Sequence, residues 1–266
     1  MNADKTFSSI CLCLSVGLSV AHSAYGQSSD LGAPGGIILR PGEERPEFQQ
    51  PAVPKGPAPR TADGKPDLSG VWAAAGYTTN IAKDMKPGEL PMTPWAEALY
   101  KERQANHSKD DPEGRCLPEG VPRRDPYPFK IIETPALVLI LFEGNVHSYR
   151  QIFLDRRTHP KDLDKNWWGD SIGHWEGDTL VVDTAGLNDQ TWLDQAGHPH
   201  SDHLHVTERY SRPDAGHISV QFTIDDPIAY SHPWSVTEVS RSLPNWEIHE
   251  YICNENNKDV QHLVGK

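Results

Sequence analysis

The sequence is poor in positive charge, in cysteine and in long apolar runs. Its 25 Lys and Arg residues are outnumbered by 37 Asp and Glu residues, and the formal net charge is −12. Such a chain repels nucleic acid and anionic lipid, so neither is an expected partner. The strongest apolar run beyond the N-terminus, residues 136–142, has the length of a strand rather than of a membrane span. We therefore expect no membrane insertion.

Motifs that mark several large enzyme classes are also missing. The chain has no Gly-x-Ser-x-Gly elbow, no phosphate-cradling glycine loop, no dinucleotide fingerprint and no His-Glu-x-x-His. Gly197, His203, His205, Glu208 and Gly216 are similar to the first cupin motif, but Glu208 comes too early and the second cupin motif is missing. A cupin-like metal protein is therefore a minor alternative.

The N-terminus has the composition of a secretory signal. Lys5 precedes an apolar stretch at residues 10–20, and Ala24 and Gly26 supply small residues for cleavage. We expect a signal peptide at residues 1–26, cleaved after Gly26, and a periplasmic or secreted protein. Residues 27–65 are rich in Pro and Gly, which predicts a flexible leader. Residues 66–266 then form a single domain.

Outside the signal segment only two cysteines remain, Cys116 and Cys253. In an oxidising compartment such a pair favours a disulfide over a catalytic thiol. The alternative interpretation places Cys253 beside Glu250 and Glu255 as part of a site.

The pattern beyond Pro128 predicts an all-β, mainly antiparallel fold. Apolar alternation and turn signals mark nine candidate strands: 129–133, 136–143, 147–154, 171–175, 179–183, 204–211, 217–224, 234–242 and 246–253. Short links between them favour a lipocalin-like up-and-down barrel, or alternatively a two-sheet sandwich. One short helix precedes the strands, with Thr93 as its cap and Pro94 in its first turn.

Residues 197–210, GHPHSDHLHVTERY, hold an unusual density of groups that titrate near neutral pH or bind metals. Its four histidines are His198, His200, His203 and His205. On a strand His203 and His205 share a face and could bind one divalent metal ion, whereas Glu208 turns to the opposite face. The alternative is a solvated strand entry whose histidines make ordinary hydrogen bonds.

The same run supplies the predicted acid–base site. We expect His205 or His200 to be the base, Glu208 or Asp202 to orient it, and Tyr230 or Glu250 to be the acid. Asp226, in the Asp-Asp-Pro sequence, is a further candidate, although that composition is also typical of a turn. Tryptophans in or beside loops can stack on a sugar or an aromatic substrate, or plug a barrel mouth: Trp167, Trp168, Trp175, Trp192 and Trp234.

Several longer motifs resemble a large family of secreted bacterial proteins of unassigned function. The resemblance runs from Thr61 to Lys266 through TADGKPDLSGVW, CLPEGVPR, GDSIGHWEGDTLVVDT, PHSDHLHVTERY, TIDDPIAYSHPW and EYICNENN. It implies that the functional positions are His200, Asp202, His205 and Glu208, together with Asp225, Asp226, Tyr230, Glu250 and Asn254. It names no reaction.

The leading hypothesis is a periplasmic enzyme that acts on a small oxygenated organic molecule, such as a sugar derivative or a plant aromatic. The chemistry would be elimination, isomerisation or hydration by His and carboxylate groups, with or without a divalent metal ion, as in a lyase or isomerase. The main alternative is a lipocalin-like binding protein without catalysis, and a structural envelope protein is the third. An enzyme requires the His and carboxylate side chains to converge in a pocket, while a binding protein does not.

Overall fold

The computed structural model describes residues 51–74, 79–123, 127–144, 148–155, 158–253 and 255. The expected signal peptide, residues 27–50 of the expected leader and Asn254 lie outside these residues. All of the described residues fall in one compact unit of the chain. Its helices are α1 (Pro94–Ala105) and the 3-10 helix η1 (Pro112–Arg115). Its strands are β1 (Gly70–Ala74), β2 (Phe129–Glu133), β3 (Leu137–Phe142), β4 (Tyr149–Phe153), β5 (Asp170–Glu176), β6 (Thr179–Ala185), β7 (His205–Ser211), β8 (His217–Asp225) and β9 (Trp234–Ser242).

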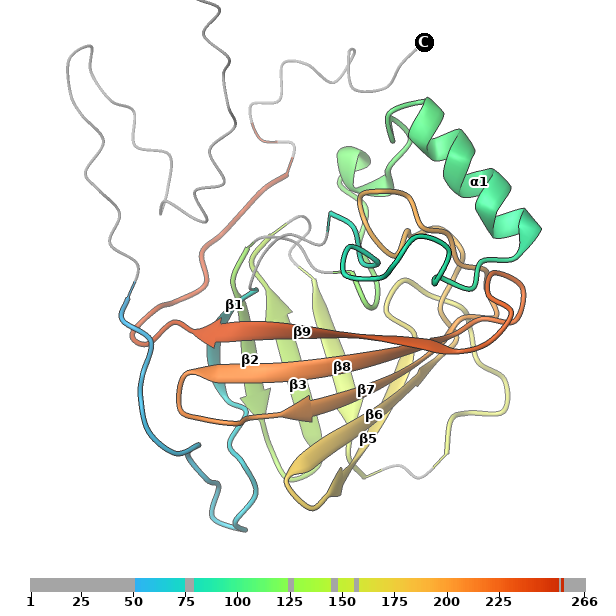
Figure 1. The fold of residues 1–266 in the computed structure, drawn as a ribbon. Coiled ribbons are helices and arrows are strands. Elements are labelled where there is room, and N and C mark those ends of the chain that lie inside the picture. Colours follow the sequence, from blue (N-terminus) through green and yellow to red (C-terminus); the bar gives the residue numbers. More distant parts are fainter. Residues whose placement is uncertain are drawn as a thin grey trace, which may run out of the picture. The chain divides into compact units, whose positions relative to one another are not determined.

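These nine strands form a closed barrel in sequence order (Figure 1). Strands β1 and β9 close it by antiparallel pairing, and every other neighbouring pair is antiparallel except β4 and β5. An odd number of strands cannot alternate in direction all the way round a ring, so closure needs one parallel pair. The β4–β5 pair supplies it. The predicted barrel is confirmed, and the sandwich alternative is wrong.

The parallel junction between β4 and β5, called the seam below, has a short ladder. Only Ile152 with Ser171 and Phe153 with Ile172 are in register there. By contrast, β8 and β9 are paired over eight positions, from His217 with Arg241 to Ile224 with Trp234. The first residues of β4 therefore have no partner on β5, and the wall of the barrel is weakest at this point.

Alternating side chains fill the interior. In β8 the apolar set Ile218, Val220, Phe222 and Ile224 is buried, while the residues between them are partly or fully exposed. A strand with one buried face must alternate in this way because successive side chains point to opposite faces. Each such buried side chain contributes about 1.5–3 kcal/mol relative to exposure.

Helix α1 and the long loops lie beyond one end of the strands (Figure 1). The helix begins as predicted, because the Thr93 hydroxyl accepts from the amide of Ala96 and Pro94 occupies the first turn. Arg103 attaches the helix to the β6–β7 loop: it stacks on Trp192 at 4.2 Å and donates to the carbonyl of Gly197 at 3.0 Å. The helix thus covers the loop that contains most of the histidine run.

The predicted disulfide is present. Cys116 and Cys253 are bonded, with an S–S distance of 2.00 Å and a sequence separation of 137. The alternative role of Cys253 as a free thiol in a site is therefore wrong. No helix in the part of the chain that the structure describes has the length and apolarity needed to span a bilayer.

Two sequence expectations about strands need correction. Residues 246–253 do not form a strand, although Trp246 and Ile248 alternate as expected. Both side chains pack on the outer face of β1 against Val71, Ala73 and Leu243. The alternation therefore arises because one face of the segment is buried, although the segment pairs with no strand. Conversely, β1 was not predicted as a strand, because it is short and contains glycine and two alanines.

The described part of the leader is attached to the barrel. Arg60 donates to Asp178, in the β5–β6 turn, with an Nη1–Oδ1 distance of 2.9 Å. The amide of Ala215, in the β7–β8 turn, donates to the carbonyl of Gly56 at 2.9 Å. Residues 51–65 therefore contact the turn end of the barrel, which the expectation of a free leader did not include.

Candidate functional site

Strand β7 separates the predicted site residues into two groups. Its burial alternates, so that Glu208 is fully buried inside the barrel while His205 lies on the outer face. The odd spacing between them requires this separation, as the sequence indicated. The two residues therefore belong to two different environments, one on each side of the barrel wall.

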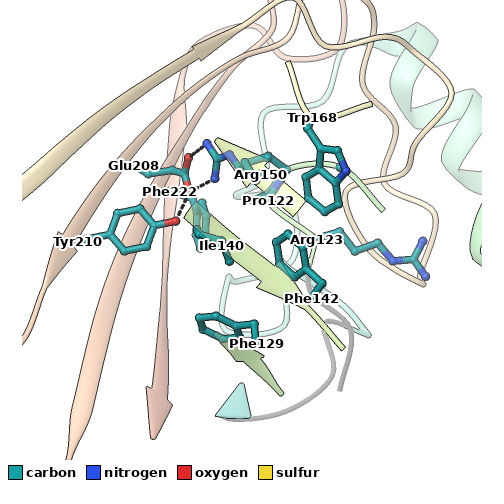
Figure 2. A pocket seen from close by; sticks show the side chains of 12 residues that line it. Pro122, Arg123, Phe129, Ile140, Phe142, Arg150, Trp168, Glu208, Tyr210 and Phe222 are labelled. Carbon is teal, nitrogen blue, oxygen red and sulfur yellow. Dashed lines mark hydrogen bonds and ion pairs between the residues drawn. The ribbon is translucent and has the colours of Figure 1, made fainter. Parts of the chain in front are cut away.

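Inside the barrel Glu208 belongs to a buried polar cluster (Figure 2). The Nη1 of Arg150 donates to the Oε1 of Glu208 at 2.9 Å, and its Nη2 donates to Oε2. Tyr210 donates its hydroxyl to Oε1 at 2.7 Å. Ser171 accepts from the Nε–H of the guanidinium at 3.1 Å, and Thr184 accepts from the second hydrogen of Nη2 at 2.7 Å. Burial of Arg150 by itself lowers the pKa of its guanidinium. The charge and the hydrogen bonds of Glu208 outweigh this effect, so the pKa is raised above its ordinary value.

A small cavity adjoins this cluster, called the interior cavity below. Its lining is mostly apolar and includes Phe129, Ile140, Phe142, Trp168 and Phe222 (Figure 2). Its volume is about 20 Å³, enough for one water molecule. This cavity is therefore too small to hold an organic ligand.

A larger space lies at the seam. This seam depression has a volume of about 500 Å³ and is lined by Ser148, Tyr149, Arg150, Gln151, Phe153, Asn166, Trp168, Gly169 and Asp170. Small-molecule sites typically have volumes of about 300–1,000 Å³, with aromatic walls and a few polar groups. The depression exists because β5 leaves the first residues of β4 unpaired.

The outer face carries a chain of alternating histidines and aspartates next to the seam. His205 Nε2 lies 2.5 Å from Asp183 Oδ1, and Asp183 Oδ2 lies 3.2 Å from His159 Nε2. His159 Nδ1 lies 2.7 Å from Asp170 Oδ2. We call these four residues the outer His–Asp chain. Exposure falls along it, from 39% for the side chain of His205 to 15% for that of Asp170.

The electrostatics of this chain follow from its hydrogen bonds. The bond to Asp183 raises the pKa of His205 above its ordinary value, although partial burial opposes the shift. Hydrogen bonds from His205 and then His159 lower the pKa of Asp183. Asp170, at the other end, forms part of the wall of the seam depression. The chain therefore connects a partly exposed histidine to a carboxylate in a ligand-sized space.

Three of the other predicted site residues, His200, Asp226 and Tyr230, are buried in the loops and form hydrogen bonds there. His200 donates from Nδ1 to the carbonyl of Ser201 at 2.9 Å, and its Nε2 lies 2.6 Å from the Thr191 hydroxyl. Burial lowers the pKa of His200, which keeps the imidazole neutral. Asp226 accepts from the amide and hydroxyl of Ser201, the latter at 2.8 Å.

Tyr230, the third, donates its hydroxyl to the carbonyl of Pro199 at 2.9 Å, and burial raises its pKa above the ordinary range. Asp226 also accepts from the amides of Ile228 and Ala229, as expected of a turn composition. Together these contacts fix the β6–β7 loop to the β8–β9 loop.

The remaining predicted residues are exposed or nearly so. Asp202 pairs with Lys165, and its other oxygen is 3.8 Å from His203. His203 lies in a turn, because β7 begins only at His205. The expectation that the two histidines share a strand face is therefore wrong. Among the residues that the structure describes, no group of three or more His, Cys, Asp or Glu side chains is placed to hold a metal ion.

Glu250 and Asp225 are exposed, and neither is among the residues that line the seam depression or the interior cavity. The predicted residues thus gather in neither of these two spaces. Of the set, His205 alone belongs to the outer His–Asp chain, and Glu208 alone to the interior cluster.

The sequence reasoning missed the residues that complete both groups. Arg150, Asp183, His159 and Asp170 come from β4, β6, the β4–β5 link and β5, far from the histidine run. Alternation could have placed Asp183 on an outer face, since it interrupts the apolar run of β6. Nothing in the sequence signals which strands are neighbours of that face. Comparisons of the chain with protein-family models, with curated proteins and with solved structures found no match.

Proposed function

We propose that this protein binds a small oxygenated organic molecule in the seam depression. The observation that carries the proposal is a ligand-sized space at the seam, with aromatic and polar side chains in the same wall. The main alternative drawn from the sequence, a lipocalin-like binding protein, fits the described geometry better than an enzyme built on the histidine run. The predicted His and carboxylate groups do not converge in the seam depression or in the interior cavity, and a binding protein does not require them to.

The composition of the depression favours an oxygenated aromatic ligand. Tyr149, with 58% of its surface exposed, Phe153 and Trp168 offer ring surfaces that stack on a planar molecule. Gln151 and Asn166 carry amide groups that donate to and accept from hydroxyl or carbonyl oxygens. A sugar derivative or a plant aromatic presents both kinds of surface.

Acid–base catalysis is the second candidate, and one observation favours it. Asp170 lines the depression and accepts from His159, which is held in turn by Asp183. A carboxylate in this position can take a proton from a carbon next to a carbonyl of the bound molecule, with the electron pair moving to the carbonyl oxygen. His159 would be a positioning residue for Asp170. Elimination, isomerisation and hydration all begin or end with such a proton transfer.

We also propose that the protein is periplasmic or secreted and that it belongs to the secreted bacterial family. A disulfide and a predicted signal peptide favour a periplasmic or secreted protein. The motifs that resemble the secreted bacterial family favour membership of it. Cleavage after Gly26 would be checked by N-terminal sequencing of the exported protein.

Titration with coniferyl alcohol, an uncharged oxygenated aromatic, tests the binding proposal by calorimetry. We expect saturable binding that Tyr149→Ala weakens about 2- to 10-fold, because one aromatic contact is worth about 0.5–1.5 kcal/mol. Trp95→Ala is the matched control, since Trp95 is an exposed aromatic on α1, with 45% of its surface exposed. Absence of binding, or equal effects of both variants, would contradict the proposal.

Proton exchange tests the catalytic candidate. Phenylacetone in D₂O should lose its acidic C–H signal in proton NMR faster with the protein than without it, and Asp170→Asn should abolish the acceleration. Glu176→Gln removes an exposed outer-face carboxylate and serves as control. If the wild-type protein gives no acceleration, or Asp170→Asn retains it, the binding function stands alone.

A further inference from the structure

The seam depression and the interior cavity share two residues. Arg150 and Trp168 line both spaces, one on each side of the barrel wall. Arg150 belongs to β4, which pairs with β3 but has no β5 partner at this position, and Trp168 belongs to the link that leads into β5. The two spaces are therefore neighbours that share the side chains of Arg150 and Trp168.

The Trp168 ring is the main part of this partition. It stacks on Phe142 of β3 with a centroid distance of 4.7 Å and an interplanar angle of 7° (Figure 2). Such a stack contributes only about 0.5–1.5 kcal/mol beyond the free energy of burying the two ring surfaces. A ligand ring that stacks on Phe142 in place of the indole therefore compensates for the lost contact. Outward rotation of the indole would vacate the volume of a two-ring system beside Phe142, in the cavity that Phe222 also lines, and one six-membered ring is smaller than an indole.

The charges around the cavity select what can enter. Its two cations are already paired, Arg150 with Glu208 and Arg123 with Asp111, the latter at 2.8 and 2.9 Å. An anionic ligand would have to compete with these buried carboxylates, and breaking a buried pair costs about 3–5 kcal/mol. An uncharged ring buries its apolar surface in the cavity without breaking either ion pair.

We propose that the depression and the cavity are two halves of one site for an uncharged aromatic molecule, with Trp168 as the gate between them. The inference rests on the proposed binding function and extends it. The ring of the ligand takes the place of the indole beside Phe142 and Phe222. Its oxygen substituents remain in the depression near Asn166 and Asp170.

Fluorine NMR of the protein labelled with 4-fluorophenylalanine tests this inference. The sequence has six phenylalanines, of which Phe129, Phe142 and Phe222 line the cavity and Phe153 lines the depression. Their signals can be assigned with single Phe→Leu variants. Coniferyl alcohol should shift the signals of Phe153, Phe142 and Phe222 together.

The other outcomes separate the two proposals. A shift of Phe153 alone would confine the ligand to the depression, which overturns the gate and leaves the binding function intact. No shift of any signal at saturating concentration would overturn both. Ferulate has the same ring with a carboxylate in place of the alcohol. Its carboxylate meets Glu208 if it enters the cavity and Asp170 if it remains in the depression, so ferulate should bind at least 10-fold more weakly, and equal affinity would refute the charge argument.

Association kinetics examine the gate itself. If Trp168 must rotate before the ring enters, Trp168→Ala should increase the association rate constant of coniferyl alcohol several-fold in stopped-flow fluorescence. If Trp168 is only a stacking surface of the depression, the same variant should raise the dissociation rate and leave association unchanged, and the gate is then excluded. Trp95→Ala should change neither rate.

Discussion

Arg150 and Glu208 form a doubly hydrogen-bonded ion pair inside the barrel, with an Nη1–Oε1 distance of 2.9 Å, although they are 58 residues apart in the sequence. The side chains are 4% and 0% exposed. The pair links β4, at the seam, to β7 on the other side of β5 and β6. It helps to fix the position of β4, which has only two residues in register with β5.

Removing the carboxylate of this pair should destabilise the protein strongly. Glu208→Gln leaves the buried Arg150 charge uncompensated, and breaking a buried pair in this way costs about 3–5 kcal/mol. Urea denaturation followed by circular dichroism measures the loss. Glu176→Gln breaks the exposed pair with Arg209 and should cost at most about 1 kcal/mol. Similar losses for both variants would show that the buried charge is compensated by other groups.

The pair of His205 and Asp183 should stabilise the fold only within a pH window. The pKa of His205 is raised above 6.5, so its contribution is complete below that value and is lost as pH rises through the folded-state pKa. The pKa of Asp183 is lowered below 3.8, so its contribution is lost as pH falls through that lower value. The difference in unfolding free energy between wild type and His205→Gln should therefore peak at about pH 5–6 and vanish at alkaline pH.

Two groups near the pair bear on this measurement. His159 contacts the second oxygen of Asp183, and the charge of Asp225 also raises the pKa of His205. Proton NMR of the His205 ring gives its pKa directly, and Asp183→Asn should lower it. His203→Gln, at a more exposed histidine, controls for the loss of an imidazole. A His205 pKa at or below 6.5 would contradict the prediction.

His200 should have the opposite effect on acid stability. Burial lowers its pKa, so the unfolded chain binds a proton near pH 6.5 that the folded protein does not. Stability from this residue is present above about pH 6.5 and falls with decreasing pH. His200→Asn loses the contact with Thr191 and is less stable at neutral pH, but its stability should decline less steeply between about pH 6.5 and 4.5. Parallel declines for variant and wild type would show that His200 accepts a proton in the folded state.

The disulfide should contribute a large share of the stability. It closes a loop with a sequence separation of 137, for which chain entropy gives about 4–5 kcal/mol. The double variant Cys116→Ser/Cys253→Ser should lose about that amount in urea denaturation, and reducing agent should affect only the wild type. An unchanged midpoint after full reduction would mean that the unfolded chain is constrained in another way.

Much of the fold was predictable because its signals are local. The helix follows from Thr93 and Pro94, and strands β2 and β9 have the bounds that alternation indicated. The error at residues 246–253 is also instructive. Alternation reports that one face of a segment is buried, and here the buried face packs on β1 without a hydrogen-bonded neighbour.

The candidate site was predictable only one residue at a time. The spacing of His205 and Glu208 showed that they point to opposite faces, and the structure bears this out. The partners of both came from other strands, and side-chain types alone do not reveal which strands meet. The histidine density of residues 197–210 also reflects loop packing, since His200 is buried there and lines neither the seam depression nor the interior cavity.

The sequence by itself determined the strand periodicity, the helix start, the cysteine pairing and the face of each β7 side chain. The periodicity, the helix start and the side-chain faces depend on residues that are neighbours in the sequence. Each of the two cysteines beyond the signal segment has only the other as a partner. The tertiary structure decided that nine strands close with one parallel seam, that Arg150 reaches Glu208, and that Asp170, His159, Asp183 and His205 form one chain. Closure of the ring sets those contacts, because it brings together residues whose distance in space is independent of their distance in sequence.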